Sequence, residues 1–367
     1  HNQNAVGVSV DNMKQGAILD AFEEMTTPQV RRAENMLSGE MLSSERTILI
    51  QNTDVIRSAV FDRLSSSNCY YDSAMAMYDV KTGKRISRGC QATGAVLWGQ
   101  AFGTLGSNGA SEGTLGVSHS SAGFIMGVDR EFGLWRAGTV LSYGRSNMNT
   151  NALASSAHSN DVSIGIYGGR SWNALSLRLG ASYTWNMISS RRNIVTDNMN
   201  FGKVNADHLG GTSQAFAELA YHLNVSGVNI EPFANVAYVN QQMSGYHESG
   251  SVAALHIRSS DMGTTFASVG SRFSKRIKLN NGADLIPYAS IGYRHAFGHM
   301  TPKMHASWTG GIDMDIYGAP LTQDAIVTEL GTSYNLSDRI ALKVGYRGQY
   351  GQHYNNNGIT GSFSLKF

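Results

Sequence analysis

The sequence predicts an all-β membrane protein, a 12-stranded antiparallel transmembrane β-barrel preceded by an amphipathic α-helix. Three observations carry this prediction. Apolar residues recur with a period of two in twelve segments after residue 92. The polar face of these segments is mostly uncharged. The connections tend to alternate between short turns and longer loops, which is the arrangement of an outer-membrane barrel.

Composition excludes several classes of protein. Only 15% of the 367 residues are charged, below the usual quarter, while Gly (41), Tyr (16) and Phe (13) are abundant. The net charge of +2 gives no electrostatic basis for binding nucleic acid. The sequence contains no run of 18 consecutive apolar residues, so it does not predict a membrane-spanning helix. The chain opens without a signal-peptide pattern, so we expect a mature or internal segment if the protein is exported.

The N-terminal quarter of the chain carries a helical pattern. Thr27 followed by Pro28 is typical of a helix start, with a capping hydroxyl and then proline at the first helical position. Apolar residues between Ile48 and Leu64 recur at multiples of four, which predicts an amphipathic helix of about five turns. Its apolar stripe is narrow, as expected of a helix in a polar enclosure. The charged residues on its other faces are Glu45, Arg46, Asp54, Arg57, Asp62 and Arg63.

The strand pattern is clear in "ALSLRLGASYTW". Leu175, Leu179 and Tyr183 share one face, whereas Ser176 and Arg178 lie on the other. Most of the twelve segments have room for the roughly 9–11 residues that a tilted strand needs to cross a bilayer. The segments are 94–106, 118–130, 134–147, 160–171, 174–190, 207–224, 228–242, 262–275, 284–296, 325–336, 339–350 and 358–367.

The connections differ in length on the two sides of the predicted barrel. Tight turns with the sequences EFG, SWN, NVSG and LSDR follow the second, fourth, sixth and tenth segments. Long loops are predicted on the other side, among them 191–206, 243–261 and 297–324. Short periplasmic turns and longer outside loops are typical of outer-membrane barrels.

The composition of the polar face of these strands distinguishes a membrane barrel from a soluble barrel. A soluble surface carries many lysines and glutamates, whereas this face is mostly Gly, Ser, Thr, Asn and Gln with isolated charges of both signs. Such charges can pair across a bore. The opposite face of Leu, Val, Ile and Ala often ends in Tyr or Trp, as at membrane interfaces. We therefore predict that a set of charged residues lines the pore: Arg178, Glu218, Glu231, Arg272, Arg294, Glu329 and Arg347.

Ten phrases in the right order resemble the translocator domain of type Va autotransporters, a family of the type V secretion system. They include "NQNAVGVSVD", "LSGEMLSSERTILIQNTDVIRSAVFDRL", "VLWGQAFG", "SAGFIMGVDREFG", "LRLGASYTW", "IPYASIGYRHAFG" and the final "F-x-L-K-F". Each phrase is weak alone, but the resemblance covers nearly the whole chain. It implies a twelve-stranded barrel in the bacterial outer membrane, with the N-terminal helix running through its pore.

The resemblance implies further roles. Residues 1–92 would form a helical linker, the pore-plug helix and a periplasmic connector, and 93–367 the barrel. The barrel would carry an N-terminal passenger, absent from this sequence, to the cell surface. Phe363, Leu365 and Phe367 would form the signal read by the barrel assembly machinery. The other implied partners are the passenger and outer-membrane lipid, and we expect a monomer.

We expect no enzymatic activity in the chain itself. The residues suggest no catalytic group, metal site or cofactor, and related autotransporters have any protease, esterase or adhesin activity in the passenger. A stand-alone outer-membrane porin or adhesin acting through its loops is the alternative. Cys69 and Cys90 are open to two interpretations, two free thiols or a disulfide across a roughly 20-residue loop that would contribute about 3 kcal/mol.

Overall fold

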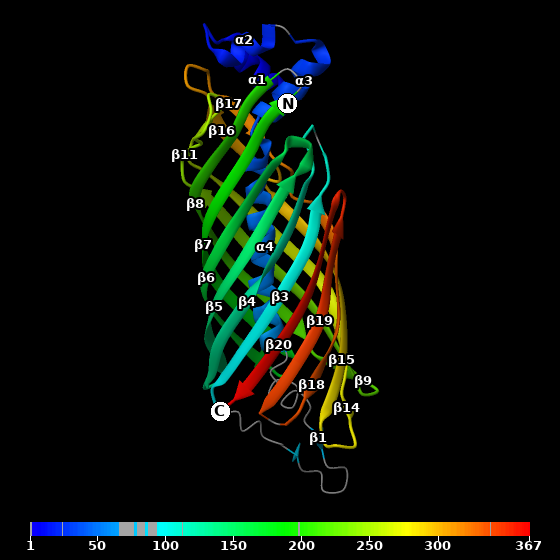
Figure 1. Ribbon diagram of the computed structural model, residues 1–367. Helices are drawn as coiled ribbons and strands as arrows, with labels where there is room; N and C mark the ends of the chain where they lie inside the picture. The colour runs from blue at the N-terminus through cyan, green and yellow to red at the C-terminus, as the bar shows by residue number, and fades with distance from the viewer. Residues whose placement is uncertain are drawn as a thin grey trace.

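The computed structural model describes residues 2–23, 25–65, 77–78, 85–86, 94–111, 113–196, 199–337 and 339–367. In these residues, four helices precede a closed barrel of twelve long strands (Figure 1). The helices are α1 (Asn2–Asp11), α2 (Ala17–Glu23), α3 (Thr27–Leu37) and α4 (Glu40–Ser65). The barrel strands are β3 (Val96–Asn108), β4 (Val117–Phe132), β5 (Trp135–Thr150), β6 (Ser155–Trp172), β7 (Leu175–Thr196), β8 (Met199–Tyr221), β10 (Val228–Met243), β13 (Ser260–Lys275), β15 (Asp284–Gly298), β18 (Asp324–Asn335), β19 (Ile340–Gly351) and β20 (Tyr354–Lys366).

The barrel is antiparallel throughout, and each long strand pairs with its neighbours in the chain. The final strand β20 pairs with the first, β3, from Tyr354↔Asn108 to Lys366↔Val96. This closure confirms the predicted fold class and leaves no open edge, which hydrocarbon would not tolerate. Three short pairings accompany it. The strand β9 (Leu223–Val225) pairs with β10, β14 (Ile277–Lys278) with β15, and β1 (Met77–Tyr78) with β2 (Arg85–Ile86).

The strands β7 and β8 correct one prediction. Residues 191–206 do not form a long loop, because β7 and β8 run for 22 and 23 residues and pair without interruption as far as Asn193↔Lys203. At about 3.3 Å per residue each strand is far longer than the bilayer, so its upper part stands above the membrane. There, lipid no longer imposes an apolar outer face, and the alternation used for prediction fades.

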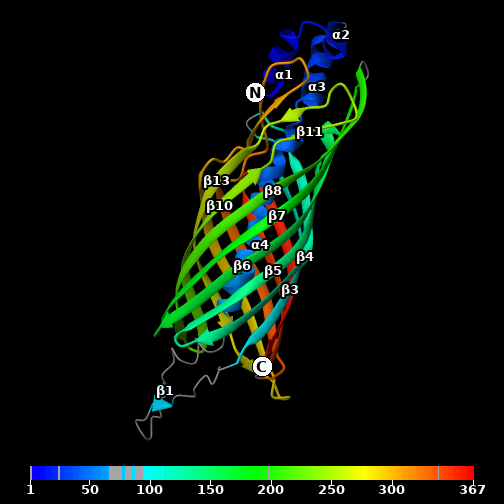
Figure 2. The same cartoon turned by 90° about the vertical axis from the view of Figure 1, so that its left-hand side faces the viewer.

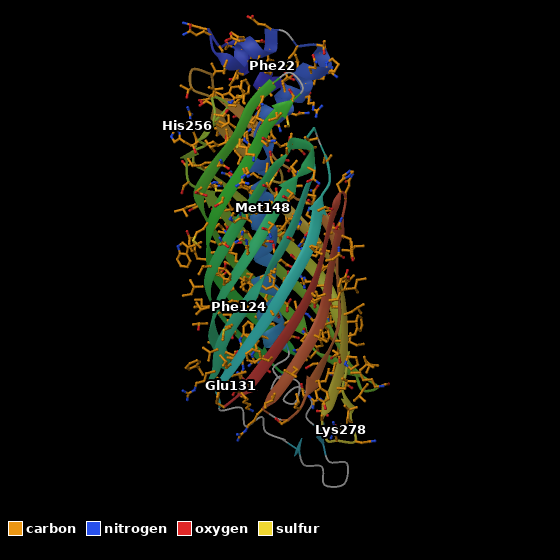
Figure 3. All side chains as sticks on the ribbon, viewed as in Figure 1. Phe22, Phe124, Glu131, Met148, His256 and Lys278 are labelled. Atoms are coloured by element: carbon orange, nitrogen blue, oxygen red, sulfur yellow. The ribbon has the colours of Figure 1, made fainter. Side chains whose placement is uncertain are left out.

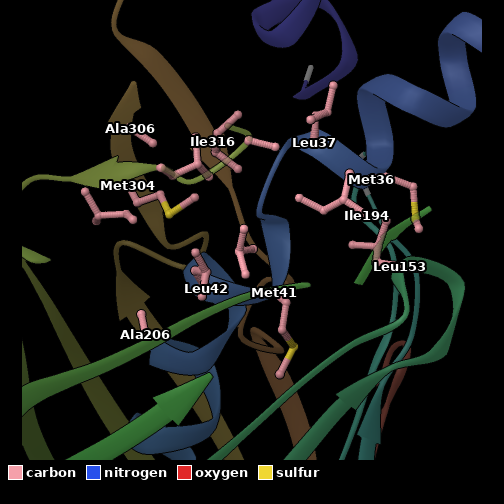
Figure 4. Packing of buried hydrophobic residues seen from close by; sticks show 14 of the residues in the cluster. Met36, Leu37, Met41, Leu42, Leu153, Ile194, Ala206, Met304, Ala306 and Ile316 are labelled. Carbon is pink, nitrogen blue, oxygen red and sulfur yellow. The ribbon is translucent and has the colours of Figure 1, made fainter. Parts of the chain in front are cut away.

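The long-loop end of the barrel carries its own small sheet. It contains β11 (Tyr246–His247), β12 (His256–Ile257), β16 (Lys303–Ser307) and β17 (Met314–Tyr317), drawn from the predicted loops 243–261 and 297–324. The helices α1–α3 lie above it (Figures 1 and 2). An apolar cluster joins the two parts and includes Met36, Leu37 and Met41 together with Met304 and Ile316 (Figure 4).

The helix α4 runs down the inside of the barrel (Figures 1 and 2). It is 26 residues long, and most of its residues are buried on every face, charged ones included. None of the helices in the described ranges is both long and apolar enough to cross a membrane. The start of α3 differs slightly from the prediction. Thr26 rather than Thr27 is the N-cap, and its backbone N–H donates to Gln29 Oε1 at 2.8 Å.

The outer surface of the barrel is apolar and the inner surface polar. Leu179 and Tyr183 are exposed on the outside, while Arg178 and Thr184, on the opposite face of the same strand, are buried. Phe124 lies on the same outer surface (Figure 3). Aromatic residues gather at the short-turn end, where Trp135 and Trp172 pack edge to face with ring centroids 6.4 Å apart. An apolar exterior around a polar interior is the arrangement expected of a barrel in lipid.

A charge placed on the outer face tests this orientation. Ile359 lies near the middle of β20 with 68% of its surface exposed. Ile359→Lys should lower the free energy of unfolding in vesicles by about 2–4 kcal/mol, because the ammonium would enter hydrocarbon. Val252→Lys, at a similarly exposed position in the loop between β11 and β12, should change it by no more than about 0.5 kcal/mol. Urea titration followed by tryptophan fluorescence gives both values. Equal effects of the two substitutions would contradict a lipid-facing β20.

Candidate functional site: the helix-filled lumen

The upper end of α4 is held by loops at the long-loop end. Glu40 accepts hydrogen bonds from the backbone N–H of Leu115 and from Asn2 Nδ2, the latter at 2.9 Å. Further down, the hydroxyl of Ser43 donates to the carbonyl of Pro302 at 3.0 Å, and that of Thr47 to the carbonyl of Ala319 at 2.5 Å. Three of these four contacts are hydrogen bonds with backbone groups of the connecting loops, so this end depends on how the loops fold.

Two charged residues follow on the next turn of the helix. Glu45 Oε2 lies 2.9 Å from Nε2 of His208 on β8, and neither side chain is exposed. The ring of Tyr246 stacks on His208 with centroids 3.9 Å apart. Arg46 donates to the carbonyl of Ser260 at 3.1 Å and to its hydroxyl. The helix therefore contacts both the wall and the outer loops at this level.

Asp54 is the centre of the middle layer. Its carboxylate lies 2.9 Å from Arg57 on the same helix and 3.0 Å from Arg347 on β19. Gln349 Nε2 donates to its second oxygen at 2.7 Å. Arg347 also pairs with Glu329 on the neighbouring strand. One buried carboxylate thus joins the helix to the wall, as a buried charge requires if it is to stay ionised.

The lower end of α4 is held by a second charged layer. Arg63 donates two hydrogen bonds to Asp129 on β4, each of 2.8 Å. The same carboxylate accepts from Arg136 and, at 2.7 Å, from the hydroxyl of Tyr167. On the other side of the helix, Asp62 pairs with Lys343 at 2.9 Å. The two hydrogen bonds from Arg63 to Asp129 form a bidentate arginine–carboxylate pair, which is among the strongest kinds of ion pair in proteins.

The wall beside this layer contains a network of its own. Arg178 pairs with Glu218 at 2.6 Å and with Glu231 at 2.8 Å, and Arg272 pairs with the same two glutamates at 2.7 and 2.6 Å. These residues come from four adjacent strands, β7, β8, β10 and β13. Ser65, the last residue of α4, donates to Glu231 at 3.3 Å. The network therefore contacts the helix where it leaves the lumen.

The structure places every predicted pore-lining residue on the inner face of the barrel. Arg294 joins the middle layer through Gln349, to which it donates at 2.8 Å, and the other six belong to the layers described above. The predicted helix charges likewise meet wall or loop partners. Phe363 and Phe367 are exposed on the outside, and Leu365 is half-buried. Cys69 and Cys90 lie outside the described residues.

Sequence reasoning missed several partners of the helix. Asp129 and Arg136 flank a tight turn and were therefore not assigned to the lumen. The parity of β4 was the available signal, because Asp129 shares its face with the buried Ile125. The alternation does place Lys343 on the polar face of the segment 339–350, but it is not among the predicted pore-lining residues. His208 lies above the membrane level, where alternation carries less information. The sequence also could not show which charges pair.

Little open space remains beside α4. Cavities of about 50 and 40 Å³ lie against the helix, one beside Asp54 and Arg272 and the other beside Asn52 and Asp161. Each has room for only a few water molecules. Among the described residues no group of three or more His, Cys, Asp or Glu could hold a metal ion. The arrangement is suited to holding a helix, and α4 blocks the bore.

Removing the helix tests whether it closes the lumen. A chain lacking residues 2–65 should show large, stable conductance steps in planar bilayers, because water and salt replace α4. The intact chain should conduct far less. A chain lacking only residues 2–37 keeps α4 and serves as the matched control. Equal conductance of the three forms, each verified as a folded barrel by circular dichroism, would contradict a plugging role.

Glu40 provides a pH test of the upper contacts. It lies above the spanning strands, and burial raises its pKa to about 7 from an ordinary value of 4.5. A raised pKa means that the folded state binds the proton more tightly than the unfolded state between these values. Stability from this group is therefore full below about pH 4.5, falls as the pH rises towards 7 and is lost above it, by up to about 3 kcal/mol.

We expect α1 and α3 to be better protected from hydrogen exchange at pH 5 than at pH 8. Glu40→Gln should reduce this difference, because the amide does not titrate. Asp20→Asn, at an exposed acid on α2, should leave it unchanged. Protection that rises with pH in the wild type would contradict the assigned direction.

Comparison with known proteins agrees with this architecture. The family model described as "Autotransporter beta-domain" matches residues 97–347. Two proteins of Serratia marcescens, both named extracellular serine protease, are 25% and 24% identical over 357 residues, which is 95% of this chain and 32% of each of them. The chain thus spans about a third of the length of these relatives.

Three solved structures have a similar fold. The translocator domain of NalP from Neisseria meningitidis has a TM-score of 0.62 at 15% identity, covering 85% of this chain and 98% of that one. The β-domain of Bordetella BrkA gives 0.56 at 17% identity, covering 74% and 98%. The transport unit of AIDA-I from Escherichia coli gives 0.55 at 15%, covering 81% and 97%. The helix-filled barrel described here therefore belongs to the autotransporter β-domain family and is an outer-membrane translocator domain.

Proposed function

We propose that this barrel carries a passenger polypeptide, attached before α1, through its pore to the cell surface. The observation that supports this most strongly is the direction of the chain in the lumen. Glu40, at the start of α4, contacts the long-loop end, and Ser65, at its end, contacts Glu231 at the short-turn end. Since the long loops face outwards, whatever precedes α4 has crossed the membrane.

The same path explains why the lumen is polar. A passing polypeptide carries backbone N–H and C=O groups that need hydrogen-bond partners or water. The hydroxyls, amides and isolated charges of the inner wall provide both. After transport, the lumen charges pair with α4, and the helix remains as a plug. We therefore favour a translocator with a resident plug over a stand-alone porin.

The passenger is the part to which we assign any enzymatic activity. The curated relatives are named extracellular serine proteases and are about three times as long as this chain. A secreted hydrolase of that kind is the passenger class we propose. The barrel would then act as a transporter without a reaction of its own.

The remaining assignments follow from this function. We propose that residues 1–92 act as linker, plug and periplasmic connector, and 93–367 as the barrel. Phe363 and Leu365 share the outer face of the closing strand and Phe367 follows its last residue, where an assembly machine could read them before β20 pairs with β3. Closure within one chain supports a monomer.

Surface display of a foreign passenger tests the proposal. A small soluble reporter, preceded by a signal peptide, is fused before residue 2 and expressed in a Gram-negative host. We expect external protease to remove the reporter from intact cells while the barrel stays heat-modifiable on gels. A second reporter of the same size, inserted in the short turn at Asn281, should be degraded only after the outer membrane is opened. A folded barrel whose N-terminal reporter stays in the periplasm would contradict the proposed transport.

A further inference from the structure

The lipid-facing surface of the barrel carries a groove of about 900 Å³. It crosses β4, β5, β6, β7, β8 and β10, the strands that Figure 2 turns towards the viewer. The side chains that reach the outside here are apolar, apart from Thr139, the phenol of Tyr238 and one arginine, Arg130. A hollow on this face cannot stay empty or hold water, so the hydrocarbon of the membrane fills it.

Small residues form the floor of this groove and large ones its walls. Cross-strand pairing runs from Arg130 to Ala137 and on to Gly168, and further along the groove Ala181 pairs with Ala215. Larger side chains occupy the next outward-facing rows on both sides. The row towards the long-loop end holds Met126, Leu141, Ile164 and Tyr183. The row towards the short-turn end holds Phe132, Trp135, Arg170, Leu177 and Leu219, and the guanidinium of Arg170 lies over the ring of Trp172, 4.8 Å from its centroid.

The height that the groove spans along the membrane normal matches the thickness of one leaflet. It begins at Arg130, two residues before the end of β4 at the short-turn end, and reaches Val236, well inside β10. Six adjacent strands have five spacings of about 4.8 Å, which gives a path of about 24 Å. With strands tilted by about 35–45°, this path rises roughly 14–17 Å towards the membrane centre. Half the hydrocarbon thickness is about 15 Å.

Among the residues that line the groove, one is a cation, Arg130, at the lower end of this apolar path. Arg130 is exposed on the outer face and makes no ion pair with any described residue. Its neighbours in sequence face inwards and are occupied, since Asp129 pairs with Arg63, and Glu131, at the lower rim in Figure 3, pairs with Arg136. An unpaired guanidinium at the membrane interface is complementary to a phosphate, which arginine can bind with two hydrogen bonds.

We propose that this groove binds a glycerophospholipid of the periplasmic leaflet, with one acyl chain along the Ala/Gly floor and the phosphate on Arg130. The position of Arg130 at the short-turn end selects this leaflet, because the short turns are periplasmic. The site rests on the outer-membrane location of the barrel and is independent of passenger transport. It would fix the tilt and rotation of the barrel relative to the inner leaflet.

Native mass spectrometry of the detergent-solubilised full chain tests the site, with phosphatidylglycerol added at increasing concentration. The wild type should retain one lipid more tightly than the rest. Arg130→Gln should weaken this binding about tenfold, as expected for loss of charge-assisted hydrogen bonds. Lys278→Gln removes an exposed cation from the opposite side of the lower rim and should leave binding unchanged (Figure 3).

Filling the groove tests the acyl-chain contact separately. Ala215→Leu should weaken retention, because its side chain occupies the floor. Ala122→Leu, at an outward-facing position of β4 outside the groove, is the matched control. Heat-modifiability shows that each variant is folded. Wild-type affinity in both Arg130→Gln and Ala215→Leu would overturn the proposal. So would an Arg130-dependent preference for lipopolysaccharide over phosphatidylglycerol in a parallel titration, because it would assign the site to the other leaflet.

Discussion

The pairing of buried charges between α4 and the barrel wall is the constraint on which the rest of the structure depends. Asp54 and Arg63 are nearly excluded from solvent; of their wall partners, Asp129 is fully buried and Arg347 is partly buried. A charge buried without a partner costs several kcal/mol, whereas a bidentate pair offsets most of that cost. Helix and wall are therefore complementary, and neither surface would be stable in a dry lumen without the other. An empty barrel would have to fill with water.

The same constraint divides each strand between two environments. Lipid on the outside tolerates no unpaired charge, and the lumen needs polar groups to meet the helix, so the two faces of β7 differ as much as Leu179 and Arg178 do. This is why charged residues are few and why those inside carry both signs. Arg130, the cation among the residues that line the outer groove, lies close to the end of β4, where its guanidinium can leave the hydrocarbon.

How much of the fold and of the lumen the sequence predicts depends on whether a strand segment lies inside or above the bilayer. Inside the bilayer, the contrast between lipid and lumen gives every strand a period of two, so the twelve strands and the inward residues could be read from the sequence. Above the bilayer the contrast disappears, and the extensions of β7 and β8 were mistaken for a loop. Partner choice was hidden for another reason. Arg63 and Asp129 are 66 residues apart, and they meet because α4 runs inside the barrel past β4.

The two ends of α4 are held in different ways, and this difference has a consequence for the order of folding. The lower half meets charged side chains on strands, which the barrel positions by itself. The upper half donates to carbonyl groups of Pro302 and Ala319 in the connection between β15 and β18. Buried carbonyls need donors. The carbonyl of Pro302 has a second donor in its own connection, the backbone N–H of Gly318 at 2.9 Å, so α4 adds to the contacts that hold this connection. Because Ser43 and Thr47 both donate to this connection, we expect the outer loops to take their final form after α4 has entered the pore.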